Sequence, residues 1–274
     1  MRKLIVSDID GTLLRNDKSI SDHTKNTIFK AIEDGHIFAI ATGRMHGAGK
    51  IITQTLDYNG YLISCNGAVV KHLKTGELLQ AIELPKETAH AVVKICKKYD
   101  VYFHFYDIET IYAERREHLA KGYADGMAEL PEAFKFNVVF ESDLSGFVDK
   151  VPIYKIGLYS EHPEIFQKVM QEINLISGVQ TCKSLTTSFD VMAEGVSKAT
   201  GIEAIRNHYN IPVENVIALG DNENDMDMVK YAGVGVAMGN ATEALKAVAD
   251  FVTKDNESDG LVYALERFVN ESQL

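Results

Sequence analysis

Short apolar runs alternate with helical patterns at both ends of the chain, and this alternation limits the fold more than any other feature. The runs are KLIVS, HIFAIAT and YLISC near the N-terminus, and NVIALG, VGVAM and FVT near the C-terminus. Because they are apolar at successive positions, both faces of each strand are expected to be buried. That is typical of a parallel sheet covered by helices on both sides, so the pattern predicts an α/β fold.

Helical segments fill the intervals between these strands. One helix is predicted in SDHTKNTIFKAIEDG, with Ser21 as its N-cap and Gly35 at its C-terminal end. Another is predicted to begin in GVSKATGIEAI with Ser197 as its N-cap. Further helices are expected at about 44–56 and in ENDMDMVKYA, ATEALKAVA and DGLVYALERFV.

The middle of the chain has a different pattern. The runs VYFHFYD and TIYAE, separated by a short polar stretch, predict an aromatic β-hairpin. Helical segments such as KETAHAVVKICKKYD and HPEIFQKVMQEI lie among these strands. We therefore expect an antiparallel α+β domain at about 83–190, inserted into a parallel-sheet domain formed by 1–82 and 191–274.

The composition excludes several classes of partner. The net charge of −11 argues against nucleic acid or an anionic lipid surface, but a small anionic ligand remains compatible with locally concentrated positive charge. No apolar run approaches the roughly 20 residues that a membrane helix needs. The N-terminus turns acidic too early for a secretory signal, and three widely spaced cysteines suggest a reducing compartment, so a cytoplasmic protein is expected.

Three polar segments follow directly after apolar strands. They are DIDGT at 8–12, TGR at 42–44 and GDNEND at 220–225. Ligands of open parallel sheets bind beyond the carboxyl ends of the strands. If these strands are neighbours, all three segments meet at one edge of the sheet and form a candidate site.

Each segment alone also has an ordinary structural interpretation. Asp221 and Asp225 could simply favour a helix N-terminus through capping and the helix dipole. Asp8 and Asp10 could form a polar turn. Lys198, in the first turn of a predicted helix, opposes the helix dipole by only about 0.3–1 kcal/mol, which a surface lysine tolerates. The residues alone leave these alternatives open.

The crowding of carboxylates favours a divalent cation. Two like unit charges about 4 Å apart repel by roughly 4 kcal/mol at an effective dielectric constant of about 20. A phosphate approaching one aspartate faces about twice that repulsion. Mg²⁺ prefers oxygen ligands and commonly takes one or two carboxylates together with a phosphate. The residues therefore indicate a Mg²⁺-dependent phosphate site. The patterns of a Walker loop, an EF-hand, a dinucleotide-binding loop and a serine-hydrolase elbow are not met.

The segments DIDGT, ATGR, GVSKATGI and GDNENDMDM, in this order, resemble the four motifs of the haloacid dehalogenase superfamily of phosphatases. The long insert between the second and third motifs resembles the type-two (IIB) cap of its Cof-like branch. The resemblance covers the whole chain. It implies a Rossmann-like parallel-sheet core with an inserted α+β cap that closes over the site and selects the substrate.

The resemblance also implies catalytic roles. Asp8 would be the nucleophile and, with Asp221, a carboxylate ligand of Mg²⁺. Asp10 would protonate the leaving oxygen, then activate the attacking water, and would bind Mg²⁺ through its main-chain carbonyl. Thr42 would hold the phosphoryl oxygens, and Lys198 would neutralise them.

Further residues are expected to support this chemistry. The main-chain amide of Gly43 would hold the phosphoryl group, and Arg44 and Asn66 would meet the leaving group. Asn224 is expected in the substrate site, and Asp225 beside the metal ligands.

The function implied is a Mg²⁺-dependent phosphatase that hydrolyses small phosphorylated metabolites, such as sugar phosphates, through an aspartyl-phosphate intermediate. A phosphomutase of the same superfamily and a non-enzymatic sensor of phosphorylated ligands are the alternatives. The expected partner is a small phosphorylated metabolite, without nucleic acid or membrane, and the protein is expected to be a monomer or a homodimer.

Overall fold

The computed structural model describes residues 1–185 and 187–269, which divide into two compact units. The unit that we call the core unit comprises 1–43, 49–80 and 197 onward. The inserted unit comprises 81–196 together with 44–48. The predicted domain boundaries at 83 and 190 stay a prediction, because a compact unit is not by itself a functional domain. Every helix in the described residues is too short or too polar to cross a membrane.

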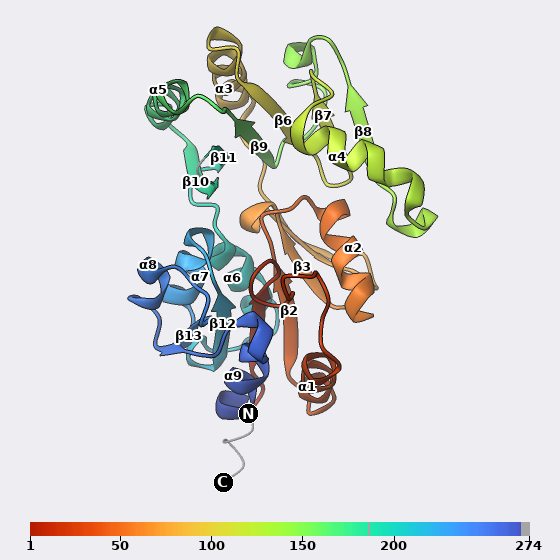
Figure 1. Ribbon diagram of the computed structural model, residues 1–274, viewed down its shortest axis with the longest axis vertical. Helices are drawn as coiled ribbons and strands as arrows, with labels where there is room; N and C mark the ends of the chain where they lie inside the picture. The colour runs from red at the N-terminus through yellow and green to blue at the C-terminus, as the bar shows by residue number, and fades with distance from the viewer. Residues whose placement is uncertain (186, 270–274) are drawn as a thin grey trace. The chain divides into compact units, whose positions relative to one another are not determined.

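The core unit is built on an eight-stranded sheet with the order β14-β13-β12-β1-β2-β3-β4-β5. Figure 1 labels β13, β12, β2 and β3 of this sheet. The strands from β14 to β3 run parallel, and β4 is antiparallel to β3. The expected α/β fold with a parallel sheet is therefore confirmed. The bounds are β1 Leu4–Asp8, β2 Ile37–Ala41, β3 Tyr61–Ser64, β4 Val69–His72, β5 Leu78–Ala81, β12 Val216–Gly220, β13 Val234–Ala237 and β14 Phe251–Val252.

Helices cover both faces of this sheet, which explains why its strands are apolar at successive positions. In β1, Leu4 and Val6 belong to one hydrophobic cluster and Ile5 to another. The first cluster includes buried residues of α6, α7 and α8, and the second includes those of α1, α2 and α9. Each fully buried aliphatic side chain stabilises the fold by roughly 1.5–3 kcal/mol. The bounds are α1 Asp22–Glu33, α2 His46–Leu56, α6 Lys198–His208, α7 Met226–Tyr231, α8 Glu243–Lys246 and α9 Gly260–Val269.

The order of the strands places a topological switch point between β1 and β12. From β1 the chain continues to β2 and β3 on one side of the sheet, whereas β13 and β14 follow β12 on the other side. The connections therefore diverge beyond the carboxyl ends of β1 and β12, which is where open α/β sheets bind their ligands. Asp8 is the last residue of β1, and Asp221 follows the last residue of β12.

The inserted unit has a six-stranded sheet with the order β10-β11-β9-β6-β7-β8. On one face, Phe166 of α5 packs edge-on against Phe189 with ring centroids 5.3 Å apart, and α3 packs against α5. The bounds are β6 Tyr102–Tyr106, β7 Thr110–Ala113, β8 Asn137–Phe140, β9 Lys155–Tyr159, β10 Val179–Leu185, β11 Ser188–Ala193, α3 Lys86–Lys98, α4 His118–Gly126 and α5 Pro163–Asn174.

The structure differs from the sequence-based expectation in several elements. The predicted hairpin is present as β6 and β7, but β8 pairs parallel to β7 rather than antiparallel. Helix α4, which the sequence did not reveal, forms the crossover that a parallel neighbour requires. The helix expected at 223–232 is divided into a 3₁₀ turn, η6 (Glu223–Asp225), and α7. The helix expected at 241–249 is reduced to the single turn of α8.

Candidate active site

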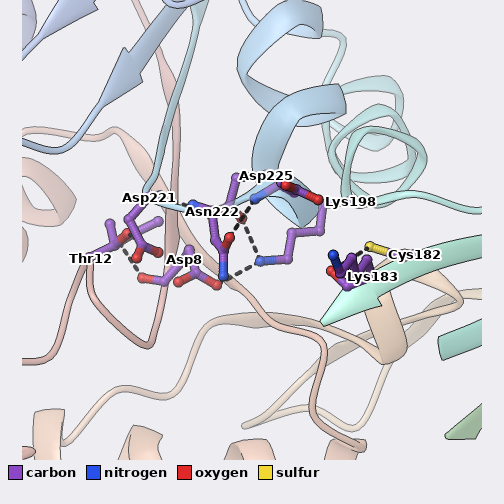
Figure 2. A network of polar contacts seen from close by, with 10 residues as sticks. Asp8, Thr12, Cys182, Lys183, Lys198, Asp221, Asn222 and Asp225 are labelled. Atoms are coloured by element: carbon purple, nitrogen blue, oxygen red, sulfur yellow. Dashed lines mark hydrogen bonds and ion pairs between the residues drawn. The ribbon is translucent and has the colours of Figure 1, made fainter. Parts of the chain in front are cut away.

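A fully buried lysine stands at the centre of the candidate site. Lys198 is the first residue of α6, and its Nζ lies 2.6 Å from Oδ1 of Asp8 and 2.6 Å from Oδ1 of Asp225. Figure 2 shows the ammonium group between the two carboxylates. The exposed fraction is 0% for the side chains of Lys198 and Asp225 and 9% for that of Asp8. The interpretation of Lys198 as an ordinary surface lysine is therefore wrong.

The charges in this cluster do not cancel. Burial alone would lower the pKa of Lys198, but Asp225 and Asp8 together raise it above its ordinary value, so the amine stays protonated. Burial raises the pKa of Asp8 well above its usual range, Asp225 raises it further, and Lys198 opposes both effects. One lysine thus faces more acidic groups than it can neutralise.

Asp221 directly follows the last residue of β12. Burial is the largest effect on its carboxyl group and, together with Asp225, raises the pKa to about 7. Thr12 Oγ1 lies 3.5 Å from its Oδ1. Gly11 has a φ of +84°, and a Cβ there would lie 2.3 Å from Oδ2 of Asp221. Only glycine therefore lets the loop after β1 approach this carboxylate so closely.

Asp225 holds the loop together rather than offering free oxygens. Its Oδ1 accepts from Lys198, and its Oδ2 accepts the main-chain N–H groups of Asp221 at 2.9 Å and Asn222 at 3.1 Å. The capping interpretation of the acidic segment is thus correct for Asp225 but not for Asp221. Asn224 is half-buried and forms no hydrogen bond with this cluster in the described part of the chain.

Three acidic side chains are arranged so that they could hold a metal ion. One carboxylate oxygen from each of Asp8, Asp221 and Asp225 lies within 4.8 Å of the others. Across 1–185 and 187–269, no hydrogen bond is made to Oδ2 of Asp8 or Oδ2 of Asp221. Hard oxygen donors, a surplus of negative charge and the room left by Gly11 fit a small divalent cation such as Mg²⁺.

The side chain of Asp10 is not part of this group of three acids, although its charge contributes to the raised pKa of Asp221. It pairs with Lys18, whose Nζ is 3.1 Å from Asp10 Oδ1, and 42% of the side chain is exposed. An exposed pair of this kind stabilises a fold by about 0–1 kcal/mol at most. The expected contact of Asp10 with a metal was through its main-chain carbonyl, and it stays a prediction, as does the role in proton transfer.

The predicted phosphate-binding residues gather at the ends of β2 and β3, next to β1. The N–H of Thr42 donates to the carbonyl of Ile63 at 2.8 Å, and the N–H of Asn66 donates to the carbonyl of Thr42 at 3.0 Å. A Cβ on Gly43 would lie 2.8 Å from Asn66 Oδ1, so these two residues are also close. Arg44 belongs to the inserted unit by its contacts, and its role at the substrate stays a prediction.

Sequence reasoning missed two residues that support the site. Thr12 contacts Asp221, although it was noted only as part of the first polar segment. Asn240 Nδ2 donates to the carbonyl of Gly11 at 2.8 Å and so fixes the glycine loop. The signal for Asn240 was available, because it stands in a polar segment after β13, as the predicted site residues do after their strands.

Comparisons with known proteins agree with this geometry. The chain matches the family of haloacid dehalogenase-like hydrolases over residues 5–265. It is 29% identical to 5-amino-6-(5-phospho-D-ribitylamino)uracil phosphatase YitU of Bacillus subtilis, over 97% of both chains. It is 28% identical to phosphatase YwpJ of the same bacterium, over 97% of this chain and all of the relative.

A solved structure resembles the whole fold as well. The subclass IIB sugar phosphatase BT4131 superposes with a TM-score of 0.80 at 25% identity, covering 97% of this chain and 98% of its own. The family match spans nearly the whole chain, and the named relatives are phosphatases. The chain therefore belongs to the haloacid dehalogenase-like hydrolases, among the Cof-like phosphatases of subclass IIB.

Proposed function

We propose that this phosphatase hydrolyses small phosphorylated metabolites in a Mg²⁺-dependent reaction, through a phosphoryl group carried by Asp8. The observation that supports this most directly is the buried contact of Lys198 with Asp8 and Asp225. It fixes one oxygen of Asp8 and leaves the other without a hydrogen bond from the described residues. A carboxylate held in this way is oriented for attack, which is how covalent catalysis by carboxylates begins.

The proposed reaction has two steps, transfer of the phosphoryl group to Asp8 and its hydrolysis. In the first, Asp8 Oδ2 forms a bond to phosphorus, the bond from phosphorus to the leaving oxygen breaks, and Asp10 gives that oxygen its proton. In the second, Asp10 takes a proton from water, the water oxygen bonds to phosphorus, and the acyl–phosphate bond breaks. Inorganic phosphate leaves and both carboxyl groups return to their starting state. A positioned acid–base group typically contributes 10²–10⁴-fold to the rate.

The acidic residues of the proposed site need positive charge beside them before a phosphate can approach. Asp8 and Asp221, with the main-chain carbonyl of Asp10, would hold Mg²⁺. The ion, when bound, supplies the positive charge that lets a phosphate dianion approach these acids. Lys198 supplies fixed positive charge from the other side of Asp8. The hydroxyl of Thr42 and the N–H of Gly43 are proposed to hold the phosphoryl oxygens, and Asn66 the leaving group.

The proposed substrate class is a phosphomonoester with a hydroxylated organic part. Two observations on relatives support it. YitU is named for a substrate that carries a phosphoribityl chain, and BT4131 is named a sugar phosphatase. Arg44 and Asn224 are kept as proposed substrate contacts on the strength of the family motifs alone.

The test is a hydrolysis screen over phosphorylated metabolites, with and without Mg²⁺, for the wild type and Asp8→Asn. We expect phosphate release that depends on the metal and falls by about a thousandfold or more in the variant, because the nucleophile is lost. Asp227→Asn, an exposed aspartate in α7, is the matched control and should keep full activity. Equal turnover by Asp8→Asn would contradict the nucleophile assignment. Saturable binding without turnover would favour a sensor.

A further inference from the structure

Three successive residues after β3 have a left-handed backbone. Cys65, Asn66 and Gly67 have φ values of +51°, +54° and +105°, and all three are buried. A left-handed backbone is costly for residues other than glycine, although asparagine adopts it more readily than most. Such strain persists only where the surrounding structure holds it, and it is common at functional sites. We call these residues the Cys65–Gly67 turn, and its contacts show what holds it.

The turn contacts the start of α6. A Cβ on Gly67 would lie 1.9 Å from the main-chain oxygen of Ser197 and 3.2 Å from the main-chain nitrogen of Lys198. Ser197 is the N-cap residue of α6, and its carbonyl accepts the N–H of Thr200 at 3.1 Å. This carbonyl is part of the first helical turn, so it cannot swing aside as the tip of a side chain can. Only glycine therefore lets α6 begin so close to this turn.

A second glycine lets the next part of α6 approach the sheet. A Cβ on Gly201 would lie 2.4 Å from Cγ2 of Ile63, a fully buried residue of β3. The Cys65–Gly67 turn is itself held by β5, because Gln80 Nε2 donates to the carbonyl of Gly67 at 2.7 Å. The position of α6 is therefore defined at two points, one residue before Lys198 and three residues after it.

The position of α6 decides where the Lys198 ammonium can lie. Lys198 is the first residue of the helix, directly after the carbonyl that Gly67 contacts. Its Nζ reaches Oδ1 of Asp8 and Oδ1 of Asp225, each at 2.6 Å. The lysine side chain is fully buried, so a shift of the helix would cost these contacts without exposing the ammonium to solvent that could replace them. A misplacement of about 1 Å can lower the rate of a catalysed reaction about a hundredfold.

We propose that the Cys65–Gly67 turn sets the position of the Lys198 ammonium, with Gly67 and Gly201 as positioning residues that act through this lysine. This rests on the proposed phosphatase function. The two glycines hold α6 at the distance from the sheet at which Lys198 orients Asp8 for attack on phosphorus. Glycines that served packing alone would affect folding in the same way whether or not Lys198 were present.

The experiment is a double-mutant cycle between Gly67 and Lys198. In the wild-type background, Gly67→Ala should lower kcat for phosphate release by about 10–100-fold, because the helix must move and takes the ammonium with it. In the Lys198→Met background, the same change should lower the residual kcat by about twofold or less, because the group that Gly67 positions is already absent. A role in packing alone would lower both values by the same factor.

Gly201→Ala is the second variant, and it decides the question if Gly67→Ala does not fold. Alanine favours a helix more than glycine does, so this variant moves α6 away from Ile63 without weakening the helix itself. It should lower kcat by about 3–10-fold, again only when Lys198 is present. The control is Gly35→Ala, which has a φ of +91° but no described atom within 4 Å of the added Cβ, and it should leave kcat unchanged.

Equal losses of kcat in the two backgrounds, or an unchanged kcat in both glycine variants, would overturn the proposal. If the wild type hydrolyses no phosphomonoester, the proposed function fails, and the same cycle is then measured by urea unfolding. Each glycine variant should lose less stability in the Lys198→Met background than in the wild type, because the contacts of the ammonium with Asp8 and Asp225 are already gone. Losses of stability that simply add would overturn the positioning role.

Discussion

Two buried lysines, one in each compact unit, show how differently the two sheets present charge. Lys198 begins a helix at the end of a parallel sheet and contacts two carboxylates, with a third acid nearby. Lys155 lies on the face of a largely antiparallel sheet and pairs with the carboxylate of Asp190. Parallel strands gather functional groups at their ends, whereas antiparallel strands present them on a face. The first cluster keeps surplus negative charge that suits a cation, whereas in the second a lysine and an aspartate of opposite charge are paired.

The largest effect is expected when the core lysine is removed. Lys198→Met leaves Asp8 and Asp225 buried without their cation, so phosphate release should fall by about a thousandfold or more. Stability should fall by about 3–5 kcal/mol, because a buried pair is broken from one side. Activity and urea unfolding of the variant are compared with those of Lys230→Met, an exposed lysine of α7. Activity within tenfold of the wild type would remove Lys198 from the proposed mechanism.

Breaking the second pair from one side should mainly affect folding stability. Lys155→Met removes the cation that pairs with the buried carboxylate of Asp190 and should lower the free energy of unfolding by about 3–5 kcal/mol. Lys155→Met/Asp190→Leu removes both charges and should recover most of that loss. Both variants are measured by chemical denaturation. The control is Lys98→Met, which removes an exposed ion pair with Glu172 and should change stability by about 1 kcal/mol or less. A double variant as unstable as the single one would mean that the pair itself stabilises the sheet.

A methyl group added at Gly11 tests whether the loop after β1 positions the carboxylate of Asp221 in the core unit. Gly11→Ala places a Cβ against Oδ2 of Asp221 and should raise the Mg²⁺ concentration for half-maximal activity by about 10–100-fold, because the carboxylate must move. Gly76→Ala is a matched control, since Gly76 also has a positive φ, +74°, but nothing within 4 Å of the added atom. An equal metal requirement in both variants would show that the loop does not position Asp221.

The smallest effect is expected for the buried side chain of His104 in the inserted unit, as a pH dependence of stability. The pKa of His104 is lowered in the folded protein to about 3, chiefly by burial, so between about pH 3 and 6.5 the unfolded chain binds the extra proton. Its contribution to stability is therefore complete above pH 6.5 and is lost as the pH falls, by up to about 1.4 kcal/mol per pH unit. The difference in unfolding free energy between wild type and His104→Phe, measured from pH 7 to 4.5, should follow this slope. A constant difference would mean that the imidazole can be protonated in the folded state.

The sequence predicted the core well because its signals are local. Apolar runs predicted the parallel strands, and polar segments after them placed Asp8, Thr42 and Asp221 at one edge of the sheet. The contacts of Asp225 were not predictable, because its carboxylate accepts hydrogen bonds from the Lys198 ammonium and from two loop N–H groups at once.

The inserted unit was harder to predict because its decisive pairings are distant in sequence. The register that places His104 opposite Gly157 joins β6 to β9 and leaves no local signal. The parallel pairing of β8 depended on α4, whose sequence HLAKGYADG contains two glycines and so has weak helix propensity.

The adjacency of β1 and β12 also bears on when the site can form during synthesis. Asp8 is made among the first residues, but Lys198 and Asp221 follow only after the whole inserted unit has been translated. The strands of the inserted unit pair among themselves, so that unit can fold while the later part of the core is still being made. Pairing across so long an interval slows folding, although a longer loop adds little to the closure cost. A ribosome-bound chain that ends before β12 would thus hold Asp8, the proposed nucleophile, and already have a folded inserted unit, yet have no phosphatase activity.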